Sequence, residues 1–334
     1  MRTTITRLLV CLLMAACAAT AGAASYTYKR LGNPQEAHTR PSSGTAMMGG
    51  GADLDEAFRW LCEKGDGGDV LVLRATGDDA YNPYINSLCK TNSVATLVIP
   101  DRAAALDPAV AATIQQAAVV FIAGGDQANY VRGWQGTPVA AAINAHIAAG
   151  KPVGGTSAGL AVLGEFAYGA LNDKPDDADL ASTEVLPDPY FYRVTLVRRL
   201  LRIPHLENLL TDSHFAQRDR MGRTLGFLAR LMQDGWSAAP REVAIDASSA
   251  VLVQGDGGAT VVGKGKGAYF LKPTRSPELC RPGAPLTFHE VSVQHVPAGG
   301  QFDLVSWKST GGVDYSLSVD KGRITSTQAG GSLY

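Results

Sequence analysis

Apolar runs typical of buried strands alternate with amphipathic segments along the first half of the chain. The predicted strands are continuous apolar runs, as expected where a sheet is covered on both faces, and they span 45–51, 68–77, 94–100, 117–125 and a short segment ending at Val153. Helices with one apolar face are predicted between them, over residues 52–65, 107–117 and 138–150. This alternation predicts an α/β fold with a doubly wound, mainly parallel sheet.

Particular residues indicate where the predicted helices begin and where the predicted strands end. Thr137 is predicted to cap the last of these helices, because Pro138 follows it at the first helical position. The Gly-rich turns Gly49–Gly51, Gly124–Gly125 and Gly154–Gly155 are all expected at the carboxyl ends of strands. Ligands gather at that edge of a doubly wound sheet.

The two flanks of this region follow other patterns. Residues 25–44 are predicted to be irregular, whereas short alternating runs beyond about residue 240 predict strands at 242–246, 249–254, 259–263, 268–272, 288–296 and 302–307. These strands either extend the same domain or form a small C-terminal lobe. We expect an α/β domain over residues 25–255 and a β-rich C-terminal extension over residues 256–334.

The first 24 residues have the three parts of a secretory signal peptide. Arg2 and Arg7 supply positive charge, Leu8–Ala16 is apolar, and Ala21–Ala23 is a small-residue cleavage site. The apolar run is too short for a membrane span. The sequence therefore predicts a secreted or periplasmic protein with no membrane attachment in its mature form.

Removal of that leader leaves three cysteines, Cys62, Cys89 and Cys280. An odd number in an exported protein allows one disulfide and one free thiol. Cys62 and Cys89 are the closer pair in sequence, and three buried unpaired cysteines are the alternative.

Composition narrows the classes of partner. The hydrophobic content of 46% over 334 residues is ample for a core. The net charge of −1 indicates neither a nucleic acid nor an anionic membrane surface as a partner. The six histidines are scattered and no HExxH motif occurs, so no metal and no cofactor is predicted.

The first candidate for chemistry is Ser157, within Gly155-Thr156-Ser157-Ala158-Gly159. A strand before the serine and a helix starting at Ala158 are the context of a nucleophile elbow, in which flanking glycines permit a sharp turn. Free amides and the helix dipole would favour an oxyanion there. An ordinary Gly-rich turn is the alternative.

A serine nucleophile needs a base, and His214 has the most suggestive surroundings. Asp212 precedes it by two residues, and three arginines follow closely: Arg218, Arg220 and Arg223. The alternative is a helix start capped by Asp212 or Ser213, with a solvated basic face.

Four ordered motifs together resemble the peptidase S51 family and, within it, the cyanophycinases. They are Gly124–Gln127, Gly155–Gly159, Asp212–Phe215 with the arginines that follow, and the segment 74–85. The resemblance covers about residues 45–255. It implies a flavodoxin-like core related to class I glutamine amidotransferases, with serine where those enzymes have cysteine. It also implies a serine exopeptidase that cleaves cyanophycin, an aspartate backbone with arginine on each β-carboxyl, to β-Asp-Arg dipeptides.

The resemblance assigns roles by position. Ser157 would be the nucleophile and His214 the general base, with the amides of Ala158 and Gly125 (or Gly124) as the oxyanion hole. The implied substrate-binding residues are Gln127, Asp212, Ser213, Arg218, Arg220 and Arg223. Arginine forks suit the carboxylates of such a substrate, and acids suit its guanidinium groups.

One departure concerns the acid that orients the histidine. Relatives have Gly-Ile-Asp-Glu where this chain has Ala244-Ile245-Asp246-Ala247, so the glutamate is missing. Asp246, Glu242 and Asp173 are the candidate replacements. Two alternatives therefore stay open, a dipeptidase acting on Asp-X or isoaspartyl peptides and a catalytically weak polymer-binding relative. The expected partner is cyanophycin or an Asp-rich peptide, and a homodimer remains open.

Overall fold

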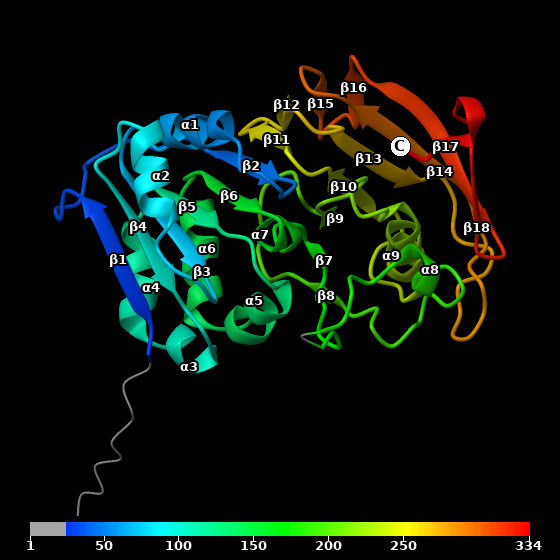
Figure 1. The fold of residues 1–334 in the computed structure, drawn as a ribbon, viewed down its shortest axis with the longest axis horizontal. Coiled ribbons are helices and arrows are strands. Elements are labelled where there is room, and N and C mark those ends of the chain that lie inside the picture. The colour runs from blue at the N-terminus through cyan, green and yellow to red at the C-terminus, as the bar shows by residue number, and fades with distance from the viewer. Residues whose placement is uncertain (1–24, 175) are drawn as a thin grey trace, which may run out of the picture.

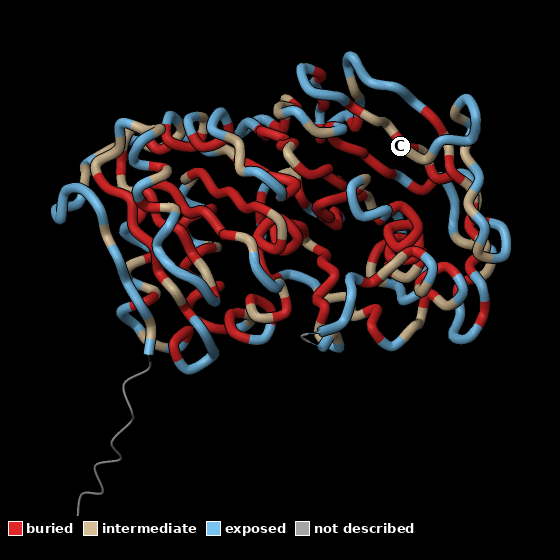
Figure 2. Tube along the Cα trace, viewed as in Figure 1, coloured by how far each residue is buried: buried red, intermediate tan, exposed pale blue. Residues whose placement is uncertain are grey.

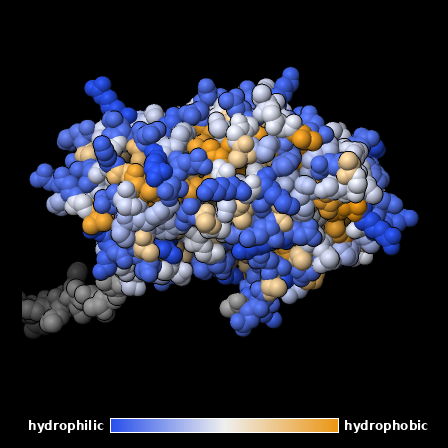
Figure 3. Space-filling view, turned by 45° about the horizontal axis from the view of Figure 1, so that its top comes forward, coloured by the Kyte–Doolittle hydropathy of each residue, from blue (hydrophilic) through white to orange (hydrophobic). Residues whose placement is uncertain are grey.

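Two mixed β-sheets, each with helices packed on it, make up the molecule (Figure 1). The computed structural model describes residues 25–174 and 176–334, so the predicted leader lies outside the described residues. Buried residues concentrate in the strands of both sheets and in the helices that face them, while the outer turns are exposed (Figure 2). Hydrophobic side chains gather only in small separate areas of the face that Figure 3 shows.

The first sheet contains the predicted parallel core. Its strands are, in spatial order, β1 (Thr27–Gly32), β4 (Ser93–Val98), β3 (Asp69–Arg74), β5 (Val119–Ile122), β6 (Val153–Thr156), β2 (Gly44–Met48), β11 (Ser249–Gln254), β12 (Gly258–Gly263), β15 (Gln301–Asp303) and β16 (Lys308–Thr310). The neighbours from β4 to β2 pair in parallel. The predicted mainly parallel arrangement is therefore confirmed for the centre of this sheet.

Helices cover both faces of this core, as a doubly wound sheet requires. They are α1 (Asp55–Lys64), α2 (Tyr81–Leu88), α3 (Arg102–Ala105), α4 (Pro108–Gln116), α5 (Gln127–Trp134), α6 (Pro138–Ala148) and α7 (Ala158–Ala161). Side chains of a strand point alternately to its two faces. Along β3, Val70 and Val72 pack in the cluster that contains α1 and α2, whereas Leu71 and Leu73 pack with α4, α5 and α6. Both faces are buried, which explains the continuous apolar runs.

The second sheet contains the strand that leads to His214. Its strands are, in order, β18 (Arg323–Ser326), β17 (Val313–Asp320), β14 (Phe288–Val296), β13 (Ala268–Pro273), β10 (Arg241–Ile245), β9 (Leu209–Asp212), β7 (Phe166–Tyr168) and β8 (Leu196–Arg198). Helix α9 (Met221–Gln233) packs its apolar face on β10, β13 and β14, beside the short α8 (Ser182–Val185). A 3-10 helix at Ala329–Gly331 follows β18.

The C-terminal strands extend both sheets rather than forming a lobe of their own. β12 pairs with β11 in the first sheet, and β13 pairs with β10 in the second. Strands from both sides of residue 255 thus share each sheet. The domain boundary at that residue stays a prediction.

Two local expectations from the sequence are wrong, and a third is confirmed only in part. Residues 25–44 are not all irregular, because β1 forms an antiparallel edge on β4. Thr137 is the N-cap residue of α6 and Pro138 starts the helix, as predicted, but the Thr137 hydroxyl makes no capping hydrogen bond and donates instead to the carbonyl of Trp134 at 2.7 Å. Gly154 and Gly155 lie inside β6 instead of a turn, and a Cβ on Gly155 would approach the Gly159 carbonyl carbon to 2.6 Å.

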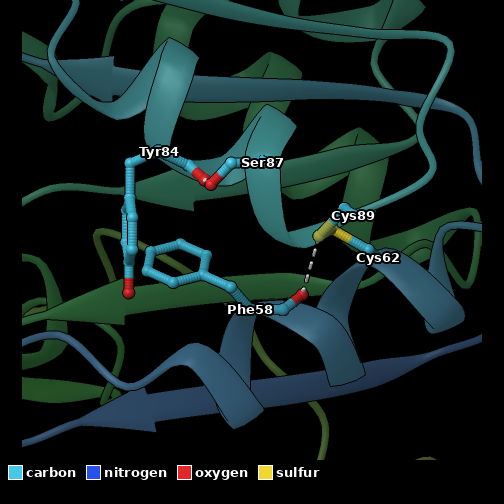
Figure 4. The surroundings of a disulfide bond; sticks show 5 residues. All are labelled: Phe58, Cys62, Tyr84, Ser87 and Cys89. Atoms are coloured by element: carbon cyan, nitrogen blue, oxygen red, sulfur yellow. Dashed lines mark hydrogen bonds between the residues drawn. A yellow bond between two sulfur atoms is a disulfide. The ribbon is translucent and has the colours of Figure 1, made fainter.

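A disulfide joins Cys62 of α1 to Cys89, which follows α2 (Figure 4). The structure thus decides between the two alternatives for the cysteines, and Cys280 is a buried free thiol. Next to the bridge, Phe58 contacts Tyr84 edge to face, with ring centroids 5.5 Å apart (Figure 4). The bridge therefore ties together the two helices on one face of the parallel core.

We expect Cys62→Ser to lower the free energy of unfolding by about 2–4 kcal/mol, because it releases a cross-link from the unfolded chain. The bridge closes a separation of 27 residues. Denaturant unfolding of the oxidised proteins measures the change. Cys280→Ser is the control and should cost clearly less, and equal losses for both variants would contradict a stabilising bridge.

Candidate active site

Ser157 lies on the turn between β6 and α7, with φ 53° and ψ −116°. Such a backbone conformation is strained for a residue other than glycine and is held by its surroundings. Glycines on both sides make the turn possible, since a Cβ on Gly159 would lie 2.0 Å from the Ile122 carbonyl oxygen. The Ser157 amide donates to the carbonyl of Met48 at 3.1 Å, which fixes the turn to the end of β2.

His214 follows β9 and meets Ser157 from the second sheet. Its Nε2 lies 2.8 Å from the Ser157 Oγ, and its amide donates to the carbonyl of Gly49 at 2.7 Å. Gly50 has φ +85°, and a Cβ there would lie 2.3 Å from the His214 Nε2. The glycine turn after β2 therefore leaves the space that the imidazole occupies.

The surroundings of His214 favour its neutral form. Burial lowers its pKa, and the nearby Arg218 and Arg220 lower it further, against the raising effect of the hydrogen bond to Gln217. A neutral imidazole is the form that can take a proton from a serine hydroxyl. His146, by contrast, is buried in α6 with Nε2 2.9 Å from the Pro152 carbonyl oxygen, and burial lowers its pKa to about 4.

The partner of the other ring nitrogen is a residue that the sequence analysis missed. His214 Nδ1 lies 3.0 Å from Oε1 of Gln217. The only sequence signal for this contact is the spacing, because Gln217 follows His214 by three residues within one short motif. Glutamine is not an acid, so a search for carboxylates passes over it.

The three carboxylates considered for this position have other partners within the described part of the chain. Asp246 accepts the backbone N–H of Gln217 at 2.8 Å. Glu242 is fully buried, accepts the hydroxyl of Thr224, and has its pKa raised well above the usual value by burial. Asp173 pairs with Arg193 at 2.8 Å.

Buried ion pairs hold the segment around His214. The carboxylate of Asp212 accepts hydrogen bonds from Arg223, at 2.9 Å from Nε and 2.6 Å from Nη2. Arg220 Nη1 donates to the same carboxylate at 3.1 Å. Although burial alone would raise the pKa of Asp212, the two guanidinium groups lower it. Burial and the charge of Arg223 lower the pKa of Arg220 to about 10.

The three arginines differ in how open they are. The side chain of Arg223 is 2% exposed, that of Arg220 8%, and that of Arg218 40%. Arg218 and Arg220 both donate to Oδ2 of Asp179, at 2.8 and 3.1 Å. The guanidinium group of Arg223 thus binds a carboxylate of the protein itself, whereas that of Arg218 remains accessible from the solvent.

A cavity of about 470 Å³ opens beside Ser157 and His214. The predicted oxyanion-hole residues Gly125 and Ala158 line it. All the predicted substrate-binding residues line it too: Gln127, Asp212, Ser213, Arg218, Arg220 and Arg223. Further charged residues in the lining, which the sequence analysis did not single out, are Asp126, Arg132, Lys174, Asp177 and Asp179. The structure therefore brings the scattered motifs into one cavity that carries charges of both signs.

No cluster of three or more metal-ligating side chains occurs in residues 25–174 and 176–334. In the same ranges, no helix has both the length and the apolar composition for crossing a bilayer.

Comparison with known proteins agrees with the motifs. The profile of peptidase family S51 matches residues 78–187, a span that contains Ser157 and ends before His214. Cyanophycinases of Synechococcus elongatus and Thermosynechococcus vestitus are each 31% identical over 241 residues, which covers 66% of this chain and 66% of each relative. The chain thus spans just under two thirds of the length of these relatives.

Among solved structures, a peptidase from an acI-B1 Actinobacterium superimposes with a TM-score of 0.47 and 18% identity, covering 67% of this chain and 88% of that one.

The α/β fold carries an elbow serine in contact with a histidine, which is the pair of groups that a serine-type peptidase uses, and part of the chain matches a peptidase family. More specifically, the chain resembles peptidase family S51 over residues 78–187 and is similar to the two cyanophycinases over a longer span.

We expect Gly50→Ala to reduce peptidase kcat/KM by roughly 100-fold or more, because the new methyl group displaces the imidazole from Ser157. The matched control is Gly150→Ala, at a similar φ of +73° but with nothing within 4 Å of the added Cβ. Both changes strain the backbone, by about 1–2 kcal/mol. Steady-state kinetics and thermal unfolding of both variants separate the two effects, and equal activity of the two would show that Gly50 does not make room for His214.

Proposed function

We propose that this protein is an exported serine exopeptidase that hydrolyses cyanophycin to β-Asp-Arg dipeptides. The observation that carries the proposal is the 2.8 Å contact of Ser157 Oγ with His214 Nε2 beside a cavity of mixed charge. Relatives named cyanophycinase, at 31% identity, support the substrate class. Cyanophycin presents carboxylates and guanidinium groups along its length, which suits a cavity with charges of both signs.

In the proposed mechanism, Ser157 Oγ attacks the carbonyl carbon of the scissile bond while its proton passes to His214 Nε2. The amides of Ala158 and Gly125 receive the oxyanion. The imidazolium then gives the proton to the leaving nitrogen as the carbon–nitrogen bond breaks. Water, deprotonated by the same imidazole, hydrolyses the acyl-enzyme and returns Ser157 to its hydroxyl form.

Export is part of the proposal. The leader-like pattern of residues 1–24 supports it. The Cys62–Cys89 disulfide also supports it, since structural disulfides persist mainly in oxidising compartments.

The nearer alternative is a dipeptidase that acts on Asp-X or isoaspartyl peptides. Comparison of kcat/KM for the polymer and for short peptides separates the two enzymes, because only the first binds an extended chain productively.

Ser157→Ala should leave a folded protein that releases β-Asp-Arg at least about 10⁴-fold more slowly, since no other group forms the acyl-enzyme. Chromatography of the products from purified polymer measures the release. Sedimentation with insoluble cyanophycin then tests retained binding. Undiminished release by this variant would remove Ser157 from the mechanism, and a parent protein that binds the polymer without dissolving it would favour the polymer-binding alternative.

Arg218→Lys should lower kcat/KM for cyanophycin by roughly tenfold, because lysine keeps the charge but loses the fork for a substrate carboxylate. Its stability should change by less than about 0.5 kcal/mol, as is usual for an exposed ion pair. The contrasting variant is Arg223→Lys, which should lose about 2 kcal/mol or more of unfolding free energy because its fork is buried on Asp212. If Arg218→Lys has the same kcat/KM as the parent protein, another residue of the cavity binds the substrate carboxylate.

A further inference from the structure

The nitrogen of His214 that points away from Ser157 contacts an uncharged side chain. Nδ1 lies 3.0 Å from the Gln217 Oε1. An amide oxygen only accepts hydrogen bonds, so Nδ1 carries the hydrogen and Nε2 has its lone pair free for the hydroxyl of Ser157. This is the tautomer that a general base requires.

Gln217 is itself held in place by a buried carboxylate. Its backbone N–H donates to Asp246 Oδ1 at 2.8 Å, and the other oxygen of Asp246 accepts the backbone N–H of Lys266 at 3.2 Å. The amide of Arg218 donates to the carbonyl of His214 at 3.0 Å, which closes the turn that carries both side chains. Asp246 therefore fixes the backbone of Gln217, while the side chain of Gln217 contacts the ring.

The residue that follows Asp246 is Ala247. It is buried, and a Cβ added to Gly51 would lie 3.2 Å from its methyl group. This methyl group has no hydrogen-bonding atom to offer the imidazole.

We propose that Gln217 is the positioning residue of His214, and that this protein carries out its serine chemistry with a neutral amide in the place of the usual triad acid. The inference rests on the proposed serine mechanism and extends it. Gln217 fixes the orientation and the tautomer of the ring, but it supplies no negative charge to the imidazolium that forms as Ser157 attacks.

Of the charged side chains that act on His214, two lower its pKa and one raises it. Burial lowers its pKa, Arg218 and Arg220 lower it further, and Asp179 opposes them from the segment between β7 and α8. The turn at Gly49–Gly51 and the elbow at Gly155–Gly159 bring no charged side chain to the ring. The ring therefore keeps its base form to lower pH than an imidazole paired with a carboxylate.

The test measures the rate at which diisopropyl fluorophosphate modifies Ser157 as a function of pH. Mass spectrometry of the intact protein monitors the modification. Phosphorylation of Oγ with loss of fluoride depends on the base form of His214 and needs no peptide substrate. Gln217→Glu should move the acid limb of this profile upward by about one pH unit or more, because a carboxylate favours the imidazolium. Gln217→Ala should lower the plateau rate by about 10–100-fold, as expected when the ring loses its orientation.

Two measurements separate a positioning role from a merely structural one. Gln217→Ala should lower kcat for cyanophycin with KM within about twofold of the parent value, because the change acts on the chemical step. The charge control is Gln116→Glu, an exposed site on α4 that should keep the parent profile. Thermal unfolding checks the fold of each variant, and if Gln217→Glu does not fold, the plateau rate of Gln217→Ala decides.

The outcomes distinguish this inference from the proposed function. Two results would overturn the role of Gln217 alone, provided that the parent protein is labelled normally. One is an acid limb that does not move in Gln217→Glu, and the other is a plateau rate in Gln217→Ala equal to that of the parent. A parent protein whose Ser157 resists labelling at every pH overturns the serine mechanism and this inference with it.

Discussion

The site depends on the end of strand β2, where two consecutive carbonyl groups hold the two reacting residues. Met48 accepts the amide of Ser157, and Gly49 accepts the amide of His214. Ser157 follows β6 and Met48 ends β2, both in the first sheet, whereas His214 follows β9 of the second, so the bond from His214 to Gly49 links the two sheets at the point where chemistry would occur. The next residue, Gly50, has no side chain and leaves room for the imidazole. A short backbone segment thus sets the 2.8 Å contact between Ser157 and His214.

The ionic groups of the site divide into a buried and an open set. Asp212 and Arg223 satisfy each other inside the protein, with side chains 4% and 2% exposed. A buried charge that lost its partner would be costly, so this pair specifies the path of the segment between β9 and α9. Arg218 and Asp179 are far more exposed and line the cavity. An exposed ion pair contributes little to stability. Arg218 and Asp179 can therefore separate at small cost, and each can bind a charged group of a ligand instead.

The neutral partner of His214 changes the electrostatic balance of the proposed mechanism. A carboxylate at Nδ1 both orients the ring and stabilises the imidazolium, whereas the amide of Gln217 does only the first. The negative charge of Asp246 lies one residue further out, on the backbone of Gln217. The remaining rate acceleration then rests more heavily on the oxyanion donors at the elbow and on the placement of the substrate by the charged cavity.

The parallel core, the elbow at Ser157 and the candidates that line the cavity could be predicted from the sequence, because these features follow from local patterns: continuous apolar runs, glycines beside a serine, and spaced motifs. Which groups are in contact became clear from the folded structure. It placed residues 27–32 on the edge of β4, put Gly155 inside β6, and divided the C-terminal strands between two sheets. It also showed that the imidazole of His214 contacts the side chain of Gln217. The three candidate carboxylates, Asp246, Glu242 and Asp173, bind other partners. Hydrogen bonds of this kind depend on distances of a few tenths of an ångström between segments far apart in the chain, and no periodicity along the sequence encodes them.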